Sequence, residues 1–206
     1  MGVLEAARLY AITPDKEPAA ILDLVGAVLR GGADVVQLRH KILARGELLA
    51  LAKEVGRLVH DAGRVFIVND HLDLALLAGA DGVHLGGDDL PVEAARRVAG
   101  RGFLIGASVN TPELARAAVA AGADYLGAGP AFVTGVKPDK AVIGPAGVAR
   151  VVEAVAVPVF AIGGIEPGNV SRLVAAGVRR ACLIRGLAEA ADPEAATREL
   201  KAALAA

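Results

Sequence analysis

Short apolar runs and amphipathic stretches alternate along this chain almost from end to end. The first amphipathic stretch, 17–31, places Ile21, Val25 and Val28 on one face at helical spacing. The apolar runs predict buried strands, at 7–12, 34–39, 65–69, 82–85, 103–107, 124–127, 158–162 and 180–184. The amphipathic stretches predict helices, at 17–31, 45–62, 71–78, 91–99, 112–121, 145–155, 168–176 and 193–205.

A repeated motif marks the step from helix to strand. A helical stretch ends in glycine and an apolar run follows at once, in the copies Gly32-Ala33-Asp34, Gly79-Ala80-Asp81, Gly122-Ala123-Asp124 and the degenerate Gly177-Val178-Arg179. Glycine suits the left-handed position that closes a helix. Residues just after such strands lie together at one end of a parallel sheet, and polar residues follow these runs.

Eight strands, each followed by a helix, predict an α/β fold of the (β/α)8 TIM-barrel type. The near-continuous apolar strands are typical of a parallel sheet that is buried on both faces. We expect residues 1–206 to form a single barrel domain, because no linker or charge block interrupts the pattern. An open, doubly wound sheet is the structural alternative.

Composition narrows the class of function. The chain is 54% hydrophobic with a mean hydropathy of +0.50, but no apolar block approaches the roughly 18–20 residues that cross a bilayer. The net charge of -1 and the 3% aromatic content argue against nucleic-acid and membrane partners. Cys182 has no second cysteine to pair with, and residues 1–10 lack a signal-peptide pattern, so we expect a cytoplasmic protein.

The first polar cluster follows the second predicted strand. Gln37, Arg39 and Lys41 are spaced so that an extended chain points all three in one direction, toward the inner mouth of the barrel. Two cations and an amide predict a site for an anion such as phosphate. The alternative is a strand that frays into a solvated loop.

Carboxylates follow the third and fourth predicted strands. Asn69 and Asp70 end the third, and Asp88 and Asp89 follow the fourth. Neighbouring strands lie about 5 Å apart, so Asp70 is placed to share one ion with either Asp88 or Asp89. Hard oxygen ligands near a phosphate site predict Mg²⁺ as the cofactor. These residues are alternatively helix caps.

Two further segments carry small or charged polar groups. Ser108 and Asn110, after the fifth strand, suit hydrogen bonds to a heteroaromatic edge or a phosphate. In the long loop 129–144, Thr134 offers a hydroxyl and Lys137 a point charge.

The seventh and eighth strands end in residues that suit a second phosphate site. Gly164 lies in a Gly-Gly pair, and Ile184 and Arg185 end the last strand. Loops after these strands of a barrel often bind phosphate through backbone N–H groups. The alternative is a tight turn in which Arg185 pairs with Glu189.

Together these residues resemble the thiamine phosphate synthase family over nearly the whole chain, from Leu9 to about Leu187. The most specific segments are Gln37-Leu38-Arg39-His40-Lys41, Asn69-Asp70, Gly82-Val83-His84-Leu85-Gly86, Asp88-Asp89-Leu90-Pro91, Asp124-Tyr125-Leu126-Gly127, Gly129-Pro130 and Ala161-Ile162-Gly163-Gly164-Ile165. The resemblance implies a transferase of thiamine biosynthesis that joins an aminopyrimidine pyrophosphate to a thiazole phosphate and releases pyrophosphate.

The resemblance also implies roles for residues. The pyrimidine pyrophosphate site takes Gln37, Arg39, Lys41, Asn69, Ser108, Thr134 and Lys137; among these, Arg39, Lys41 and Lys137 are the catalytic cations. Asp70 and Asp89 take the place of the Mg²⁺ ligands. Gly164, Ile184 and Arg185 match the thiazole phosphate site, and a homodimer is implied.

The chain departs from the family pattern at Gly87, Asn110, Val136 and Arg185, where the family usually has Gln, His, Thr and Ser. A lost hydrogen bond to a charged group costs about 1.5–3 kcal/mol, whereas Arg185 adds charge to the thiazole phosphate site.

Three other functions stay open. The thiazole tautomerase branch shares the fold and the phosphate site, but its catalytic His falls where this chain has Pro130. A Schiff-base aldolase would use Lys41 or Lys137 as the nucleophile. A barrel that only binds a phosphorylated ligand is the third.

Overall fold

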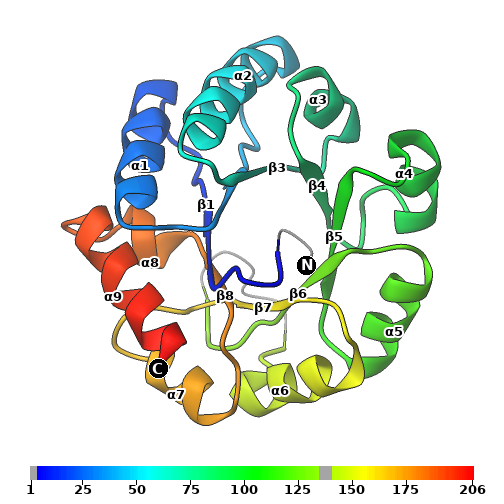
Figure 1. Cartoon of the computed structure of the whole chain (residues 1–206), viewed down its shortest axis with the longest axis vertical. Helices are drawn as coiled ribbons and strands as arrows, with labels where there is room; N and C mark the ends of the chain where they lie inside the picture. The colour runs from blue at the N-terminus through cyan, green and yellow to red at the C-terminus, as the bar shows by residue number, and fades with distance from the viewer. Residues whose placement is uncertain (1–3, 135–140) are drawn as a thin grey trace.

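The eight strands close into one parallel barrel. A computed structural model describes residues 4–134 and 141–206, and its strands pair in sequence order from β1 to β8 and back to β1. Helices form a ring outside the strands (Figure 1). This confirms the TIM barrel, and the open-sheet alternative is wrong because β1 and β8 pair with each other.

The strands lie close to their predicted bounds. They are β1 Leu9–Ile12, β2 Val35–Leu38, β3 Val65–Asn69, β4 Gly82–Leu85, β5 Leu104–Val109, β6 Tyr125–Ala128, β7 Val159–Ile162 and β8 Ala181–Leu183. The helices are α1 Pro18–Arg30, α2 Arg45–Asp61, α3 Leu72–Leu77, α4 Val92–Ala99, α5 Pro112–Ala120, α6 Gly144–Ala154, α7 Val170–Ala175, α8 Arg185–Ala188 and α9 Pro193–Ala205. The sequence analysis missed α8, whose four residues carry no helical repeat.

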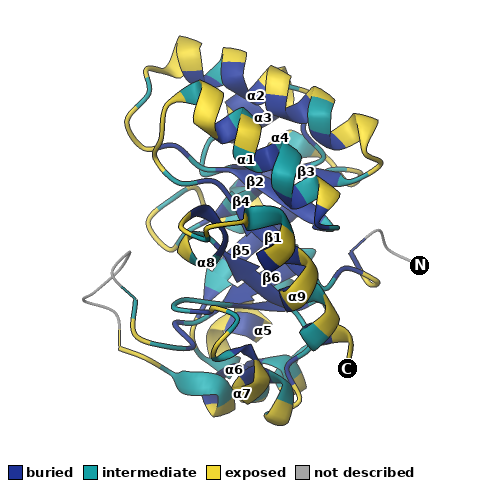
Figure 2. Ribbon diagram, turned by 90° about the vertical axis from the view of Figure 1, so that its left-hand side faces the viewer, coloured by how far each residue is buried: buried dark blue, intermediate teal, exposed yellow. Residues whose placement is uncertain are grey.

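Alternation along each strand divides the core into two layers. Leu9 and Ala11 of β1 face the helices and belong to the large outer cluster. Tyr10 and Ile12 face the barrel interior, with Val35, Val65, Ile67, Tyr125, Phe160 and Cys182. Burial follows this plan, since the strands are dark blue and the outer faces of the helices are yellow (Figure 2).

The Gly-Ala-Asp motif joins strands at the end of the barrel where they begin. Its glycines have positive φ, at 95°, 68° and 103° for Gly32, Gly79 and Gly122. Each aspartate then accepts a backbone N–H from the preceding strand. The pairs are Leu9 N to Asp34 (3.1 Å), Phe66 N to Asp81 (2.7 Å) and Ile105 N to Asp124 (2.7 Å). The motif therefore links β1 to β2, β3 to β4 and β5 to β6.

The polar residues that follow β3 and β4 do not cap the next helices, although α5 does have a side-chain cap. Thr111 caps α5, where its hydroxyl accepts the N–H of Leu114. The residues before α3 and α4 are His71 and Pro91, and neither makes a side-chain cap. Among the described residues, no helix is both long and apolar enough to span a bilayer.

Candidate functional site

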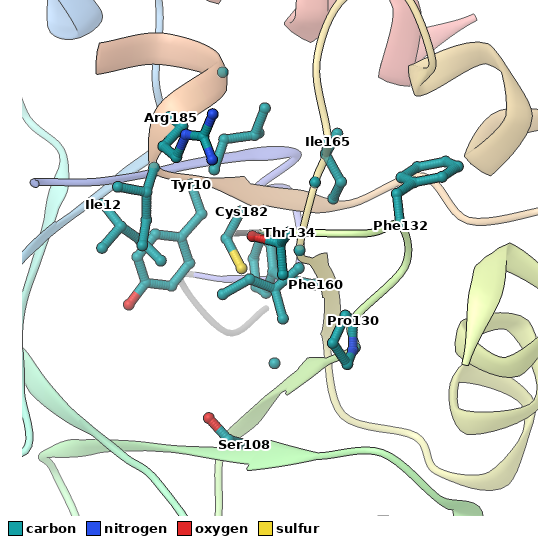
Figure 3. Close-up of a pocket in the computed structure, with 18 of the residues that line it drawn as sticks. Tyr10, Ile12, Ser108, Pro130, Phe132, Thr134, Phe160, Ile165, Cys182 and Arg185 are labelled. Carbon is teal, nitrogen blue, oxygen red and sulfur yellow. The ribbon is translucent and has the colours of Figure 1, made fainter. Parts of the chain in front are cut away.

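A cavity of about 970 Å³ opens at the end of the barrel where the strands finish. Loops that follow both early and late strands contribute to its wall, and Ser108 and Arg185 lie on opposite sides of it (Figure 3). The predicted site residues that line it are Gln37, Arg39, Asn69, Ser108, Thr134, Gly164, Ile184 and Arg185. The structure therefore brings most of the predicted polar residues to one hollow.

Arg39 is held at the rim by a carboxylate that sequence analysis missed. Asp15 accepts the Arg39 guanidinium at 2.9 Å and the Lys41 backbone N–H at 2.6 Å. Thr13 also holds the Arg39 backbone, because its hydroxyl accepts the N–H of Arg39 and donates to the carbonyl of the same residue. Partial burial opposes ionisation of Asp15, but these N–H donors lower its pKa below the usual value. Asp15 thus fixes the direction of the chain after β2.

Lys41 does not share the direction of Gln37 and Arg39. The strand β2 ends at Leu38, so the alternation assumed for an extended chain stops before Lys41. Its ammonium instead forms an ion pair with Asp70, and both residues line a second cavity of about 690 Å³. Asp89 lines this second cavity as well. The predicted anion and metal groups therefore lie in two adjoining hollows.

Asp70 and Asp89 come together as the sequence predicted. Their carboxyl groups lie close enough for each to shift the pKa of the other, and Asp89 also accepts the N–H of Gly86 at 2.7 Å. Asp70 is the one described non-glycine residue with positive φ, at 61°. Partial burial raises the pKa of Asp89, and so does Asp70; the pKa of Asp70 is lowered, against its own burial, by Asp89 and Lys41. Neither residue caps a helix.

Two touching carboxyl groups need a proton or a cation between them. They fit Mg²⁺, which takes one or two protein carboxylates and completes its shell with water and substrate phosphates. Within residues 4–134 and 141–206, no group of three or more His, Cys, Asp or Glu side chains is arranged to hold a metal. The pair therefore suits an ion that arrives with a phosphorylated ligand rather than an ion bound by protein alone.

The far wall of the cavity is built from backbone. Gly163 and Gly164 have φ of 99° and 64°, and a Cβ on Gly164 would lie 2.3 Å from the carbonyl oxygen of Val133. The Phe132 N–H bonds the Gly163 carbonyl at 2.9 Å. Glycine is thus required where the β6–α6 loop crosses the β7–α7 turn. Thr134 is the last described residue before the gap at 135–140, and Lys137 lies outside the described residues.

Arginines border this backbone wall. Arg185 begins α8, and its Nε donates to Glu189 at 2.9 Å, which is the pairing weighed as the alternative to phosphate binding. Its side chain is 55% exposed, so the pair leaves the guanidinium open to a ligand. Arg172 of α7 lies over the Phe132 ring at 5.2 Å and also lines the cavity. Sequence analysis missed Arg172 because its place in a helix gave no sign of the cavity.

Similarity to known proteins agrees with this layout. The family model described as thiamine monophosphate synthase matches residues 9–187. The chain belongs to the thiamine monophosphate synthase family. Within that family, a Haloquadratum walsbyi protein named thiamine-phosphate synthase is 42% identical over 94% of this chain and 89% of its own. A Methanoculleus marisnigri protein with the same name is 46% identical over 89% of this chain and 88% of its own.

Other members of the thiamine monophosphate synthase family differ in length. The chain matches a Thermosynechococcus vestitus thiamine-phosphate synthase at 41% identity over 96% of itself but spans 56% of that protein. A solved structure, the thiamine phosphate pyrophosphorylase from Pyrococcus furiosus, superposes with a TM-score of 0.90 at 37% identity, covering 99% of this chain and 98% of that one. The family and the barrel fold expected from the sequence are thereby confirmed.

Proposed function

We propose that this chain is a thiamine-phosphate synthase, which joins an aminopyrimidine pyrophosphate to a thiazole phosphate and releases pyrophosphate. One observation carries the proposal: a glycine-rich wall bordered by arginine forms the β7–β8 side of the main cavity, and on its β2–β4 side Arg39 is followed by the adjoining hollow that holds Lys41, Asp70 and Asp89. Two phosphorylated substrates need two such anion sites on either side of the reacting atoms. The names of relatives at 41% to 46% identity support the same activity.

The β2–β5 side suits the pyrimidine pyrophosphate. Gln37 and Ser108 offer neutral hydrogen-bonding groups to the ring, and Asn69, the last residue of β3, lines the same cavity and directly precedes Asp70. Arg39 and Lys41 supply positive charge toward the pyrophosphate. Because Lys41 lines the adjoining hollow with Asp70, the pyrophosphate would extend from the main cavity toward that hollow.

The β6–β8 side suits the thiazole phosphate. Gly164 brings backbone close to the cavity, and Ile184 and Arg185 follow β8. Thr134 completes this wall and contributes a hydroxyl toward either phosphorylated group. The roles of Lys137 and of a homodimer stay predictions from the sequence, as does a cytoplasmic location.

Magnesium is the cofactor that this arrangement favours, with Asp70 and Asp89 as the residues that would hold it. When bound, Mg²⁺ neutralises negative charge on the pyrophosphate. The protein's own part is to keep Asp70 and Asp89 adjacent, through the Gly86 N–H on Asp89 and the Lys41 ammonium on Asp70.

The reaction needs little proton transfer from the protein. The carbon–oxygen bond to pyrophosphate breaks and its electron pair leaves with the pyrophosphate, while the aminopyrimidine carries the positive charge on its methylene carbon. The thiazole nitrogen then donates its lone pair and forms the new carbon–nitrogen bond. Arg39 and Lys41 stabilise charge that grows on the leaving group, and the two anion sites hold the rings in position.

The open alternatives fit the site less well. Pro130 lines the cavity where the tautomerase branch has its catalytic His (Figure 3). Lys41, the described candidate for a Schiff-base nucleophile, is paired with Asp70 and lies outside the main cavity. Neither observation bears on the third alternative, a barrel that binds a phosphorylated ligand without turnover. A product assay distinguishes that barrel from an enzyme.

A product assay tests the proposal. We expect purified protein with both substrates and Mg²⁺ to form thiamine phosphate and pyrophosphate in equal amounts, measured by chromatography and by phosphate release with pyrophosphatase. Chelation of Mg²⁺ should abolish the product. Binding of both substrates without product would identify a non-catalytic barrel, and borohydride trapping of a keto acid on Lys41 would identify an aldolase.

A further inference from the structure

Five polar side chains form a hydrogen-bonded chain across the inside of the barrel. Gln37 Nε2 donates to Tyr10 Oη at 2.6 Å, and Tyr10 Oη lies 3.0 Å from Tyr125 Oη. His84 then joins Tyr125 Oη at 3.2 Å through Nδ1 and Ser108 Oγ at 3.0 Å through Nε2. The chain runs from β2 through β1, β6 and β4 to β5, and both of its ends, Gln37 and Ser108, line the cavity.

The surrounding barrel leaves space for this hydrogen-bonded chain, which we call the relay. Tyr10 and Tyr125 are each 1% exposed, and the two rings meet Phe160 edge-on, with centroids 5.4 and 6.1 Å away. A Cβ on Gly106 would lie 2.1 Å from Tyr125, and one on Gly127 would lie 3.2 Å from His84. Apolar side chains would fill this space without buried hydroxyl groups that need partners. The polar relay therefore calls for an explanation beyond packing.

The supply of protons fixes the direction of the relay. Burial raises the pKa of both tyrosines, so each keeps its one proton to donate. Tyr10 accepts from Gln37, and among its described partners only Tyr125 can accept the Tyr10 proton, while His84 Nδ1 can accept the proton of Tyr125. We therefore infer that Tyr10 donates to Tyr125 and that Tyr125 donates to His84. A neutral imidazole that accepts at Nδ1 donates at Nε2. Ser108 therefore accepts from His84, and its own proton is left for a ligand.

The two ends of the relay are thereby coupled. Gln37 gives one of its two amide N–H groups to Tyr10, which fixes the orientation of the amide and leaves the carbonyl oxygen as an acceptor for other partners, while Ser108 presents a donor. If Ser108 were to donate to His84 instead of accepting from it, His84 would have to change tautomer. Both tyrosine protons would then have to move, and the Gln37 amide would have to turn over. An isolated serine hydroxyl, by contrast, rotates freely between donating and accepting.

We propose that the relay of Tyr10, Tyr125 and His84 sets Gln37 as an acceptor and Ser108 as a donor together, so that the cavity selects a heteroaromatic ring whose edge pairs an amino donor with a ring-nitrogen acceptor. This inference rests on the proposed function for the identity of the ring, an aminopyrimidine. Tyr10, Tyr125 and His84 are positioning residues, since they act through Gln37 and Ser108. The corresponding 4-oxopyrimidine, with a carbonyl acceptor and a ring N–H donor, presents the opposite order and is rejected.

The direction of the relay can be measured without any ligand. We expect nitrogen-15 NMR of the imidazoles to show His84 protonated at Nε2 in the wild-type protein, with the signal assigned by loss in His84→Asn. In Tyr125→Phe, Nδ1 loses its donor and the tautomers should mix. A wild-type His84 protonated at Nδ1, or an unchanged tautomer in Tyr125→Phe, would overturn the proposal.

The selection is measured by calorimetry with the two pyrimidine pyrophosphates and Mg²⁺. We expect the wild-type protein to bind the amino form at least about 100-fold more tightly than the oxo form, because the wrong edge leaves the buried Gln37 and the half-buried Ser108 unpaired. In Tyr125→Phe this ratio should fall to roughly tenfold or less. An equal ratio in both proteins would refute the selection.

Two variants guard against effects of folding. Tyr10→Phe breaks the relay at the next bond and should lower the ratio in the same way, even where Tyr125→Phe does not fold. Phe160→Leu removes packing from the same rings without touching a hydrogen bond, so it should lower stability and leave the ratio unchanged. A wild-type protein with the expected His84 tautomer that binds neither pyrimidine would refute the ring assignment and the proposed function, but not the direction of the relay.

Discussion

At the end of the barrel where strands begin, Asp34 accepts the N–H groups of Arg8 and Leu9 at 2.9 and 3.1 Å and pairs with Lys201 at 2.6 Å. At the opposite end, Asp70 and Asp89 lie against each other, and the pKa of Asp89 is raised by partial burial and by Asp70. Both carboxylate oxygens of the first aspartate are matched to donors. The second pair has negative charge in excess of its donors, which is costly for folding but suits a cation.

The same residue type therefore has two different roles, and the partners decide which. Aspartates that follow the Gly-Ala motif hold strands together, and substituting them should reduce stability more than activity. Asp70 and Asp89 contribute less to the fold, and substituting them should reduce activity more than stability. The following substitutions test this contrast, from the largest expected effect to the smallest.

Asp70→Asn should reduce kcat/KM about 100- to 1000-fold, because it removes one of two carboxylates that favour Mg²⁺ near the leaving group. Asparagine tolerates the positive φ at this position, so the fold is retained. Steady-state formation of thiamine phosphate measures the effect. Asp61→Asn is the control, since Asp61 pairs with Arg57 on the exposed face of α2 and lines neither cavity, and activity there should stay within twofold. Equal losses in both variants would contradict the assignment.

Asp34→Asn should lower the free energy of unfolding by about 2–3 kcal/mol, because either orientation of the amide sets a donor against an N–H or against Lys201. Urea unfolding measures the loss, and kcat should be unchanged. Glu194→Gln provides the comparison, since Glu194 also binds two cations, Arg30 and Arg198, but with an exposed partner on each side. A surface pair of this kind is worth about 0–1 kcal/mol.

Acid should remove part of the Asp34 contribution. Burial opposes ionisation of Asp34, yet Lys201 and two backbone N–H groups lower its pKa in the folded state. Stability from this group is therefore present above the unfolded pKa of about 3.9 and is lost as the pH falls through the lower, folded value. In urea titrations, the difference between wild type and Asp34→Asn should shrink below about pH 4. A difference that stays constant down to pH 2 would assign the effect to packing.

Much of the fold could be predicted because its signals are local. Glycines at helix ends and apolar runs of four to six residues set most boundaries to within a residue or two. The rim was predictable in part, since residues that follow parallel strands share one end of the sheet. That rule brought Asp70 to Asp89 and put Gln37, Ser108 and Gly164 on one cavity.

The rest depends on contacts between distant segments. Lys41 points toward Asp70 because β2 ends at Leu38. Asp15, in the loop between β1 and α1, holds the chain there by accepting the backbone N–H of Lys41. Tyr10 and Tyr125 are 115 residues apart, and a periodic pattern marks each of them only as an inward-facing apolar position. Their hydroxyl groups became informative only when the closed barrel brought them together.

Gly106 and Gly127 have a consequence for redesign of this barrel. Each lacks a side chain at a position where a Cβ would lie against Tyr125 or His84. Replacing both with valine and the two rings with leucine would give an interior of conventional branched aliphatic layers, such as most TIM barrels contain. Such a protein would keep its scaffold and its phosphate-binding loops, but it would no longer distinguish an amino group from a carbonyl group on the substrate ring.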